Sequence, residues 1–540
     1  MSTEAQGGFQ RPSAALLVAW SSGRASAWAT TLGLSLVAYD QGGAGAVGLL
    51  FVVRMVPAGL AAPGVSLLAD RVPRRRVLLV GLWLRVLLTA LLAVTVTAGT
   101  AFVVVLLLAA AAAVVETAHR PAHVALLVEL APDPRRLSSA NVATSSGDYV
   151  GFLAGSVAAG ALAGGAGPGA PMLLAAVAAA VAALVVLLVP TTTRPPRTLT
   201  DASTITEQLV VGLREVAANP DQRLLATVLL VDLAVQSMVE ILLVVAALEL
   251  LGTGELGAGL LTGAWGLGGL VGGLAALALL RRTRIADGLL AGLVLAGVPL
   301  ALVGPLALPA SALGLLALVG VGFAVIEVGL LTLTQRLSAG DVLARVFGVH
   351  ELLSVLGTAL GAVVAPALVA WFGVSTALAV TGTLLPAVAV LRWVRLRRLG
   401  ATVVAPVEVY AQLRRVETLR DLPGATVETL ALRADRRALA GGERLITEGD
   451  VGDELYVVVE GELVVSTSSQ GELSVLGPGD HVGEVALLRD QRRSATVVAR
   501  VASEVLVLDR DTFLDAVTGH TGTHGAALAV AEQRLARGGV

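Results

Sequence analysis

Long apolar runs fill most of the chain up to residue 393 and restrict its fold more than any other feature. Each run is long enough for an α-helix to cross the hydrocarbon core of a bilayer, which takes about 20 residues. Charged residues interrupt the runs, and we therefore predict an α-helical membrane protein with twelve transmembrane helices. The candidate spans are 13–38, 44–69, 76–98, 100–118, 138–162, 170–190, 222–248, 256–280, 285–304, 308–333, 344–370 and 374–393.

The residue types in these runs suit a bundle of closely packed helices. The chain is 56% hydrophobic and 14% charged, and it contains 61 Gly. Small residues let helices in lipid approach one another closely, so the lipid bilayer is the expected surrounding. The chain has no Cys, which excludes disulfides and thiolate metal sites. We expect no metal and no resident cofactor.

The distribution of Arg predicts the orientation of the bundle. Arg-rich connections alternate along the chain with connections that contain almost no Arg. Under the positive-inside rule the Arg-rich connections are cytoplasmic. We therefore expect an inner or plasma membrane protein with both termini, and everything after the last span, in the cytoplasm. The supporting residues are Arg71, Arg74, Arg75, Arg76, Arg120, Arg135, Arg136, Arg194, Arg197, Arg214, Arg223, Arg281, Arg282, Arg284, Arg336, Arg392, Arg395, Arg397 and Arg398.

The longest connection in the membrane part, residues 191–220, begins with the linker-like sequence TTTRPPR. It divides the predicted spans into two sets of six. The predicted organisation is a six-helix membrane half at 1–190, a cytoplasmic linker at 191–220, a second six-helix half at 221–395, a linker helix at 396–420 and a final domain at 421–540.

The sequence pattern changes after residue 400. Between residues 443 and 508, short Val-rich runs alternate with Gly and Asp turns, which predicts a small β-barrel or jelly roll. Helical stretches at 406–420, 424–434 and 511–537 flank it, so an α+β domain is expected. Residues 401–540 hold 14 Arg against 21 Asp and Glu, and this acidic balance argues against nucleic acid as a partner.

The loop after the second span, residues 68–76 (LADRVPRRR), resembles the signature loop between the second and third helices of the major facilitator superfamily. That resemblance implies the 6+6 arrangement of this superfamily. It also implies that Asp70 at a helix end faces Arg71, Arg74, Arg75 and a neighbouring helix terminus, contacts that would hold one gate conformation. The alternative is a plain cytoplasmic anchor.

Four further segments look like an exporter-type branch of that superfamily: 54–57, 120–122, 137–141 and 335–348. Two features depart from the branch. The motif at 155–160 in the fifth span lacks the usual Pro, and Arg24 stands near a position where an Asp is common. The reversed charge argues against ordinary proton-coupled drug antiport.

Ionisable residues inside spans are costly and mark functional sites. The deepest are Arg24, Asp148, Asp232 and Glu327, which we expect to line a central cavity, with Arg24 paired to a carboxylate that the sequence does not identify. An anionic substrate on Arg24 is an alternative. Interfacial positions are expected for three others near predicted span ends: Glu116, His119 and Glu351.

Residues 483–488 (GEVALL) and 493–496 (RSAT) resemble the phosphate-binding cassette of a cyclic nucleotide-binding domain, and the resemblance extends over about 408–537. It implies that Arg493 grips the cyclic phosphate with its guanidinium fork and that Glu484 accepts from the ribose 2′-hydroxyl. Retention of both residues argues against a degenerate, empty barrel. Other ligand contacts are implied for Gly483, Val485, Ala486, Ser494 and Ala495.

Other positions in this domain have a structural interpretation or depart from the family's pattern. Gly449 and Gly452 are interpreted as turn residues. His481, His520 and His524 lack metal-ligand spacing. Val482 and Arg492 replace the usual Phe and Pro, and Arg492 is expected to be solvated.

These observations predict a secondary active transporter, an exporter of a small molecule, that cytoplasmic cyclic nucleotide regulates. Cyclic AMP is favoured and cyclic GMP is the alternative ligand; the C-terminal helix at 521–537 would transmit its binding. The alternative function is a non-transporting, membrane-anchored cyclic nucleotide receptor. A channel and an enzyme are disfavoured, because neither a selectivity filter nor a nucleophile–base set is visible. The oligomeric state stays open.

Overall fold

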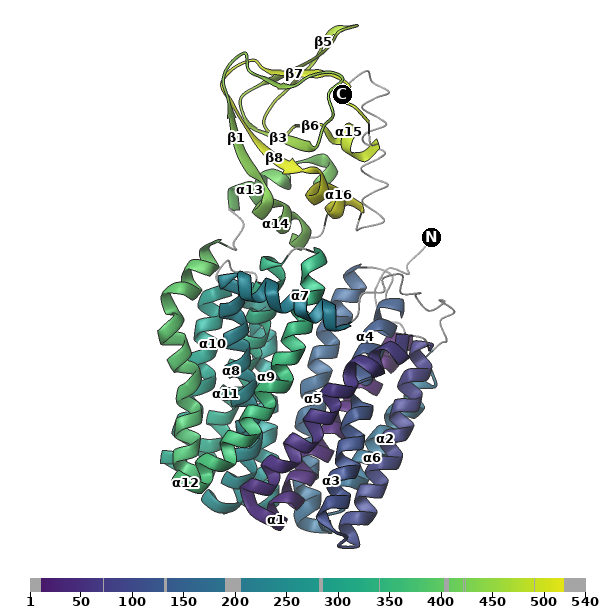
Figure 1. Cartoon of the computed structure of the whole chain (residues 1–540), viewed down its shortest axis with the longest axis vertical. Coiled ribbons are helices and arrows are strands. Elements are labelled where there is room, and N and C mark those ends of the chain that lie inside the picture. Colours follow the sequence, from purple (N-terminus) through teal and green to yellow (C-terminus); the bar gives the residue numbers. More distant parts are fainter. Residues whose placement is uncertain are drawn as a thin grey trace, which may run out of the picture. The chain divides into compact units, whose positions relative to one another are not determined.

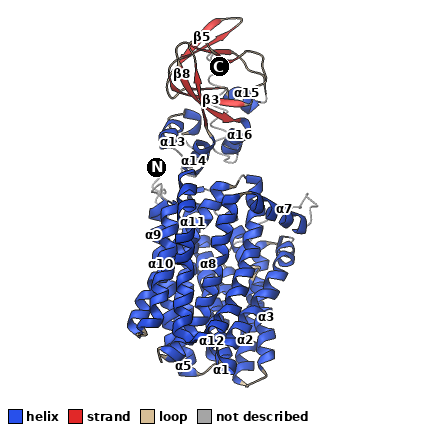
Figure 2. Ribbon diagram, turned by 60° about the vertical axis from the view of Figure 1, so that its left-hand side comes forward, coloured by secondary structure: helices blue, strands red, loops and turns tan. Residues whose placement is uncertain are grey.

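The computed structural model describes residues 11–70, 72–130, 134–189, 205–280, 285–338, 340–402, 407–420, 422, 424–489 and 491–518. The chain divides into two compact units, Met1–Gly400 and Ala401–Val540, and each has its own architecture. Figure 1 labels their elements. Among the described residues, unit 1 is helical and all strands belong to unit 2, as the colours of Figure 2 show.

Unit 1 is a bundle of apolar helices. Within the described ranges, nine helices are long and apolar enough to cross a membrane. The shorter apolar helix α6 lies among them. The elements are α1 (Arg11–Asp70), α2 (Arg74–Thr97), α3 (Phe102–Glu116), α4 (His119–Leu130), α5 (Pro134–Ala166), α6 (Ala170–Val186), α7 (Ile205–Ala218), α8 (Pro220–Val245), the π-helical turn η1 (Ala246–Leu250), α9 (Gly254–Leu280), α10 (Ile285–Leu306), α11 (Pro309–Leu337) and α12 (Gly340–Thr402).

The two longest helices each contain two predicted spans joined at glycine. Helix α1 breaks at Gly42 and Gly43, where Gly43 has a φ of +60°, and α12 breaks at Gly373, with a φ of +77°. Side chains disfavour this backbone region, whereas glycine adopts it readily. These glycines therefore turn the chain at the predicted gaps, 39–43 and 371–373, with almost no loop.

The fourth predicted span, 100–118, is too short. Helix α3 ends at Glu116, but α4 begins three residues later and continues the apolar stretch, so the span runs from Phe102 to Leu127. Glu116 and His119 consequently lie inside this span, and their predicted interfacial positions are wrong.

The predicted linker at 191–220 contains a helix. Its first part, up to residue 204, lies outside the described residues. Helix α7 forms the second part, and Val216 on it packs with Val346 and Val349 of α12 in a small buried cluster. Gly212 lies against the backbone of Arg345. This part of the linker is thus held on the second half of the bundle.

Glycine allows the central helices of unit 1 to pack backbone against backbone. A methyl group on Gly259 of α9 would lie 2.7 Å from the carbonyl oxygen of Ser156 on α5. Gly160 of α5 in turn lies against the backbone of α9. Similar contacts join α5 to α1 at Gly155 and α9 to α11 at Gly272. In the motif at 155–160, the two glycines are thus the residues at which α5 contacts its neighbouring helices.

Unit 2 consists of two antiparallel four-stranded sheets and surrounding short helices. The strand orders are β1-β8-β3-β6 and β2-β7-β4-β5. The strands are β1 (Asp435–Leu439), β2 (Arg444–Ile446), β3 (Glu454–Glu460), β4 (Leu463–Thr467), β5 (Gly471–Leu476), β6 (His481–Val482), β7 (Thr496–Ala499) and β8 (Ser503–Asp509). The helices are α13 (Val407–Leu413), η2 (Glu417–Leu419), α14 (Gly424–Arg433), α15 (Glu484–Arg489) and α16 (Arg510–Thr518). The rest of the predicted C-terminal helix, from 519, lies outside the described residues.

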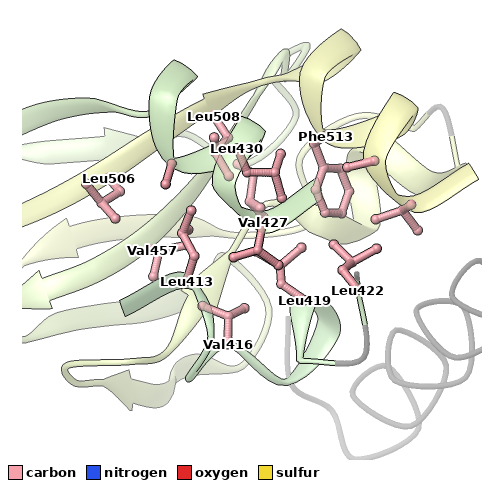
Figure 3. Close-up of a cluster of buried hydrophobic side chains, with 14 of the residues drawn as sticks. Leu413, Val416, Leu419, Leu422, Val427, Leu430, Val457, Leu506, Leu508 and Phe513 are labelled. Carbon is pink, nitrogen blue, oxygen red and sulfur yellow. The ribbon is translucent and has the colours of Figure 1, made fainter. Parts of the chain in front are cut away.

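Strand β3 separates two cores, because apolar side chains point to both of its faces. Tyr456 and Val458 pack between the sheets. Leu455 and Val457 face the opposite way, into a cluster with the helices that Figure 3 shows. A strand buried on both faces reads as a continuous apolar run, which is how residues 455–459 appear in the sequence. The helices of unit 2 are therefore packed onto the same strand that runs beside the cassette.

The glycine contacts predict that the loss of stability caused by a Gly→Ala substitution in the bundle depends on its position. Gly259→Ala should destabilise the protein by about 1–3 kcal/mol, because its methyl group meets backbone that cannot move aside. Gly273→Ala on the same helix is the control, since its methyl group would make an ordinary contact with Tyr149 at 3.8 Å. Thermal unfolding in detergent measures both. Equal melting temperatures for the two variants would contradict this account of the packing.

Candidate functional site

A small hollow opens in unit 2 between the cassette and the start of β7. Six of the seven residues predicted to contact a nucleotide line it, and Glu484 is the exception. The lining includes the Arg493 guanidinium and several apolar side chains, so the hollow offers both a cationic and an apolar surface. The lining residues are Ile446, Val482, Gly483, Val485, Ala486, Arg493, Ser494, Ala495 and Val497.

Arg493 is the cationic group of this hollow. It is only 6% exposed, and its Nη1 donates to the carbonyl oxygen of Gly483 at 3.0 Å while Nη2 donates to that of Glu454 at 2.6 Å. A methyl group on Gly452 or Gly483 would collide with the guanidinium. Gly452 therefore makes room for Arg493, a role that the interpretation of Gly452 as a turn residue missed.

A polar network beside Arg493 fixes its surroundings. The Tyr456 ring lies under the guanidinium at 5.8 Å, and the Tyr456 hydroxyl donates to Glu454 at 2.6 Å. Arg437 donates to both oxygens of the Glu454 carboxylate, at 3.1 and 3.2 Å. Burial, supported by the bond to Glu454, raises the pKa of Tyr456 to about 12. Tyr456 is therefore a neutral platform at physiological pH, and Glu454 holds it in place.

Glu484 lies behind the hollow instead of in its wall. The residue is fully buried, and its Oε1 is 3.8 Å from Nε2 of His481. The same His481 nitrogen is 3.3 Å from the hydroxyl of Thr418. His481 is thus a buried polar neighbour of the cassette, a role that its lack of metal-ligand spacing did not predict.

In unit 1, the structure brings Arg24 and Asp148 together. Arg24 Nε is 2.5 Å from the Asp148 carboxylate, and its Nη1 is 3.4 Å from Glu116, which also lies 3.6 Å from the buried Arg85. The expected pairing of Arg24 with a carboxylate is therefore present, with two partners instead of one. Since these carboxylates already neutralise Arg24, an anionic substrate on this residue is not favoured.

Asp232 and Glu327 lie in the second half of the bundle and do not join this cluster. Asp232 is 3% exposed; one of its oxygens accepts from Gln236 at 2.7 Å, and the other has no hydrogen-bond partner among the described residues. Glu327 is exposed and accepts from Tyr149 at 3.3 Å. The Tyr149–Glu327 bond joins α5 to α11.

Four aromatic side chains form a layer one helical turn from these polar groups. Trp28 stacks on Phe152 at 3.8 Å, and Trp265 meets Phe152 at 5.3 Å and Phe323 at 5.6 Å. Trp28 follows Arg24 by one turn, Phe152 follows Asp148 by one turn, and Phe323 precedes Glu327 by one turn.

The helix directions place the whole aromatic layer on one side of the polar layer. Residues 263, 266 and 269 of α9 meet residues 153, 152 and 149 of α5 in turn, so these helices are antiparallel. Helices α1 and α5 run in parallel, as do α9 and α11. The result is a polar layer closed on one face by aromatic rings contributed by both halves of the bundle.

The predicted gate residues are described only in part. Arg71 lies outside the described residues, as does the side chain of Asp70, which ends α1. Arg74 begins α2. Arg75 donates to the carbonyl oxygens of Val186 at 3.2 Å and Leu187 at 2.7 Å, and so caps the last turn of α6.

Comparison with known families identifies both units. The family model of the Major Facilitator Superfamily matches residues 16–354, well over half of the chain, and that of the cyclic nucleotide-binding domain matches residues 436–520. The chain therefore belongs to the Major Facilitator Superfamily, and its transporter domain is fused to a C-terminal cyclic nucleotide-binding domain.

The curated relatives named here match about a fifth of the chain or less. A cAMP-dependent protein kinase regulatory subunit of Yarrowia lipolytica is 38% identical over 102 residues, which are 19% of this chain and 27% of the relative. A cGMP-dependent protein kinase of Eimeria tenella is 40% identical over 84 residues, 15% and 8% of the two chains. The chain thus spans about a quarter or less of these relatives. A solved structure of the regulatory domain of Toxoplasma gondii PKA with cAMP is 33% identical, with a TM-score of 0.20, over 20% of this chain and 43% of that one.

The network around Tyr456 predicts a pH dependence. Burial alone would raise the Glu454 pKa, but hydrogen bonds from Tyr456 and Arg437 lower it below the ordinary 4.5. Its ionised form therefore stabilises the fold fully above pH 4.5, and this stabilisation disappears as the pH falls through the lowered value. Glu454→Gln should cost about 1 kcal/mol or less at pH 7, since the ion pair is part-exposed.

The difference between the wild type and Glu454→Gln should close as the pH falls below about 4.5. Thermal unfolding of both proteins between pH 7 and pH 3 measures it. Glu460→Gln, an exposed carboxylate on the same strand, controls for the loss of one negative charge. A difference that persisted unchanged at the lowest pH would refute the role of ionised Glu454.

Proposed function

We propose that this protein is a secondary active exporter of a small molecule whose transport cycle is regulated by cytoplasmic cyclic AMP. The observation that carries the proposal is the hollow around Arg493, joined in one chain to a Major Facilitator Superfamily bundle. Cyclic GMP is the alternative ligand. Cyclic AMP is preferred because the relatives from Yarrowia lipolytica, Dictyostelium discoideum and Eremothecium gossypii are all cAMP-dependent protein kinase regulatory subunits, whereas the Eimeria tenella relative is a cGMP-dependent protein kinase.

We further propose twelve spans in two sets of six. Dividing α1 and α12 at their glycine breaks and adding the 17-residue helix α6 to the nine long apolar helices gives this number. With the Arg-rich connections inside, both termini and the nucleotide-binding domain are cytoplasmic. The aromatic layer then lies on the outer side of the polar layer, and the cavity opens toward the cytoplasm.

The transport path runs through the polar layer between the two halves. Arg24 and Asp148 on one side and Glu327 on the other are accessible although they lie deep in apolar helices. Charged side chains at such positions face a bundle interior or a water-filled cavity. The aromatic layer closes this cavity on its outer side, and rearrangement of its stacked rings would open the outer exit.

The nucleotide is held mainly through its phosphate. Arg493 directs its remaining guanidinium N–H groups at the phosphate oxygens, as a planar fork suited to this anion. Gly483 lets the ligand approach the backbone, and the Ser494 hydroxyl, which is exposed at the hollow, adds a donor. Glu484 accepts from the ribose 2′-hydroxyl after a shift of the cassette, and the apolar wall of Val485 and Ala486 covers the sugar.

Removal of the Arg493 guanidinium should greatly weaken the binding of cyclic nucleotide. Arg493→Ala should weaken cyclic AMP at least about 100-fold, because two charge-assisted hydrogen bonds of about 1.5–3 kcal/mol each are lost. Isothermal titration calorimetry of the purified full-length protein measures this. Arg492→Ala is the matched control, since Arg492 is the neighbouring cation, is exposed and donates to the carbonyl oxygen of Gly449. Equal affinities for the two variants would overturn the assignment.

Regulation predicts that cyclic AMP changes access to the cavity. The chain has no Cys, so Ser145→Cys creates a single thiol on the exposed face of α5, one turn before Tyr149. An impermeant maleimide should label it in inside-out vesicles and not in intact cells. Cyclic AMP should change the labelling rate about fivefold or more, since couplings are commonly 1–3 kcal/mol.

The labelling change should vanish when Arg493→Ala is combined with Ser145→Cys. A rate that cyclic AMP leaves unchanged in the protein with intact Arg493 would show that nucleotide binding and transport are not coupled. Transport itself is tested in proteoliposomes with compounds that raise the melting temperature of the purified protein. Absence of flux for every such compound would favour the membrane-anchored receptor.

A further inference from the structure

We infer that His481 is a positioning residue that holds Glu484 for ribose recognition, and that Thr418 competes with Glu484 for the same imidazole nitrogen. The inference rests on the proposed cyclic nucleotide binding and deepens it. It assigns the preference for ribose over deoxyribose to a buried side chain that does not touch the ligand.

The position of His481 follows from the strand pairing. Strand β6 pairs with β3 so that His481 lies opposite Val457 and Val482 lies opposite Tyr456. Opposite residues of an antiparallel pair point to the same face. Val482 therefore faces the inter-sheet core and the hollow, whereas His481 faces the helix-covered core. Figure 3 shows Val457 there with Val416 and Leu419, which flank Thr418 in the chain.

The three polar groups meet inside this apolar core. His481 is 1% exposed, Glu484 is 0% and Thr418 is 4%. The distances from His481 Nε2 are 3.8 Å to Glu484 Oε1 and 3.3 Å to Thr418 Oγ1. A buried carboxylate is costly unless polar groups lie beside it, and the imidazole of His481 is such a neighbour of Glu484. His481 thereby restricts the positions that the Glu484 carboxylate can take.

The same nitrogen of His481 lies near both Thr418 and Glu484. A closer approach of Nε2 to the Thr418 hydroxyl therefore competes with its approach to the Glu484 carboxylate. Thr418 belongs to η2, in the segment that precedes the β-sheets, so this segment contacts the residue that sets ribose recognition.

The measurement is the ratio of affinities for cyclic AMP and 2′-deoxy cyclic AMP, by calorimetry on the full-length protein. His481→Leu should reduce this ratio about tenfold, because the Glu484 carboxylate loses the polar neighbour that restricts its position. His481→Gln, which can place an amide N–H near the position of Nε2, should retain most of it. Thr418→Val should leave the ratio equal to or above that of the wild type.

Val416→Ala serves as the control for packing, because it empties part of the same core without touching the polar groups. It should lower the melting temperature while leaving the ratio unchanged. The inference is overturned if His481→Leu keeps the wild-type ratio, or if His481→Leu and Thr418→Val lower it equally. A wild-type protein that binds neither nucleotide would instead refute the proposed function, so the two failures are distinguishable.

Discussion

Backbone-to-backbone contact at glycine is the constraint on which the membrane unit depends. Lipid offers helices no hydrophobic reason to associate, so close van der Waals contact must hold them together. Gly155, Gly259 and Gly272 give α1, α5, α9 and α11 that contact. The four helices are then fixed in register, and this register sets the aromatic rings at one depth and the polar side chains at the next.

Glycines leave space for a larger group in unit 2 as well. Gly452 and Gly483 leave a space that the Arg493 guanidinium fills, with backbone carbonyls as its acceptors. A charge buried to this extent needs such partners, because desolvation disfavours it. Burial accordingly lowers the pKa of Arg493, while Tyr456 and Glu454 oppose that shift. The site is thus preorganised around a cation that already has partners.

Periodicity and composition predicted the coarse architecture, because span length and Val-rich alternation follow from local physics. The breaks at Gly43 and Gly373 could be placed for the same reason. The pairing of Arg24 with Asp148 and Glu116 could not, since it depends on how α1, α3 and α5 pack. Glu116 was misplaced because α3 and α4 were not recognised as one span. Gly452 was missed because its partner Arg493 lies far from it in the sequence. His481 was missed because its contact with Thr418 depends on how η2 packs against β6.

The partners of Arg493 also bear on how a ligand could act at a distance. A phosphate that takes N–H groups of Arg493 competes with the carbonyl oxygens of Gly483 and Glu454, so binding exchanges hydrogen bonds and does not simply add them. A carbonyl that loses its donor must move or find another one. Gly483 begins the cassette and Glu454 begins β3, the strand onto which the helices of this unit pack. A displacement at either position therefore reaches those helices directly, and the difference in hydrogen bonding between the two states is the kind of differential interaction that regulation requires.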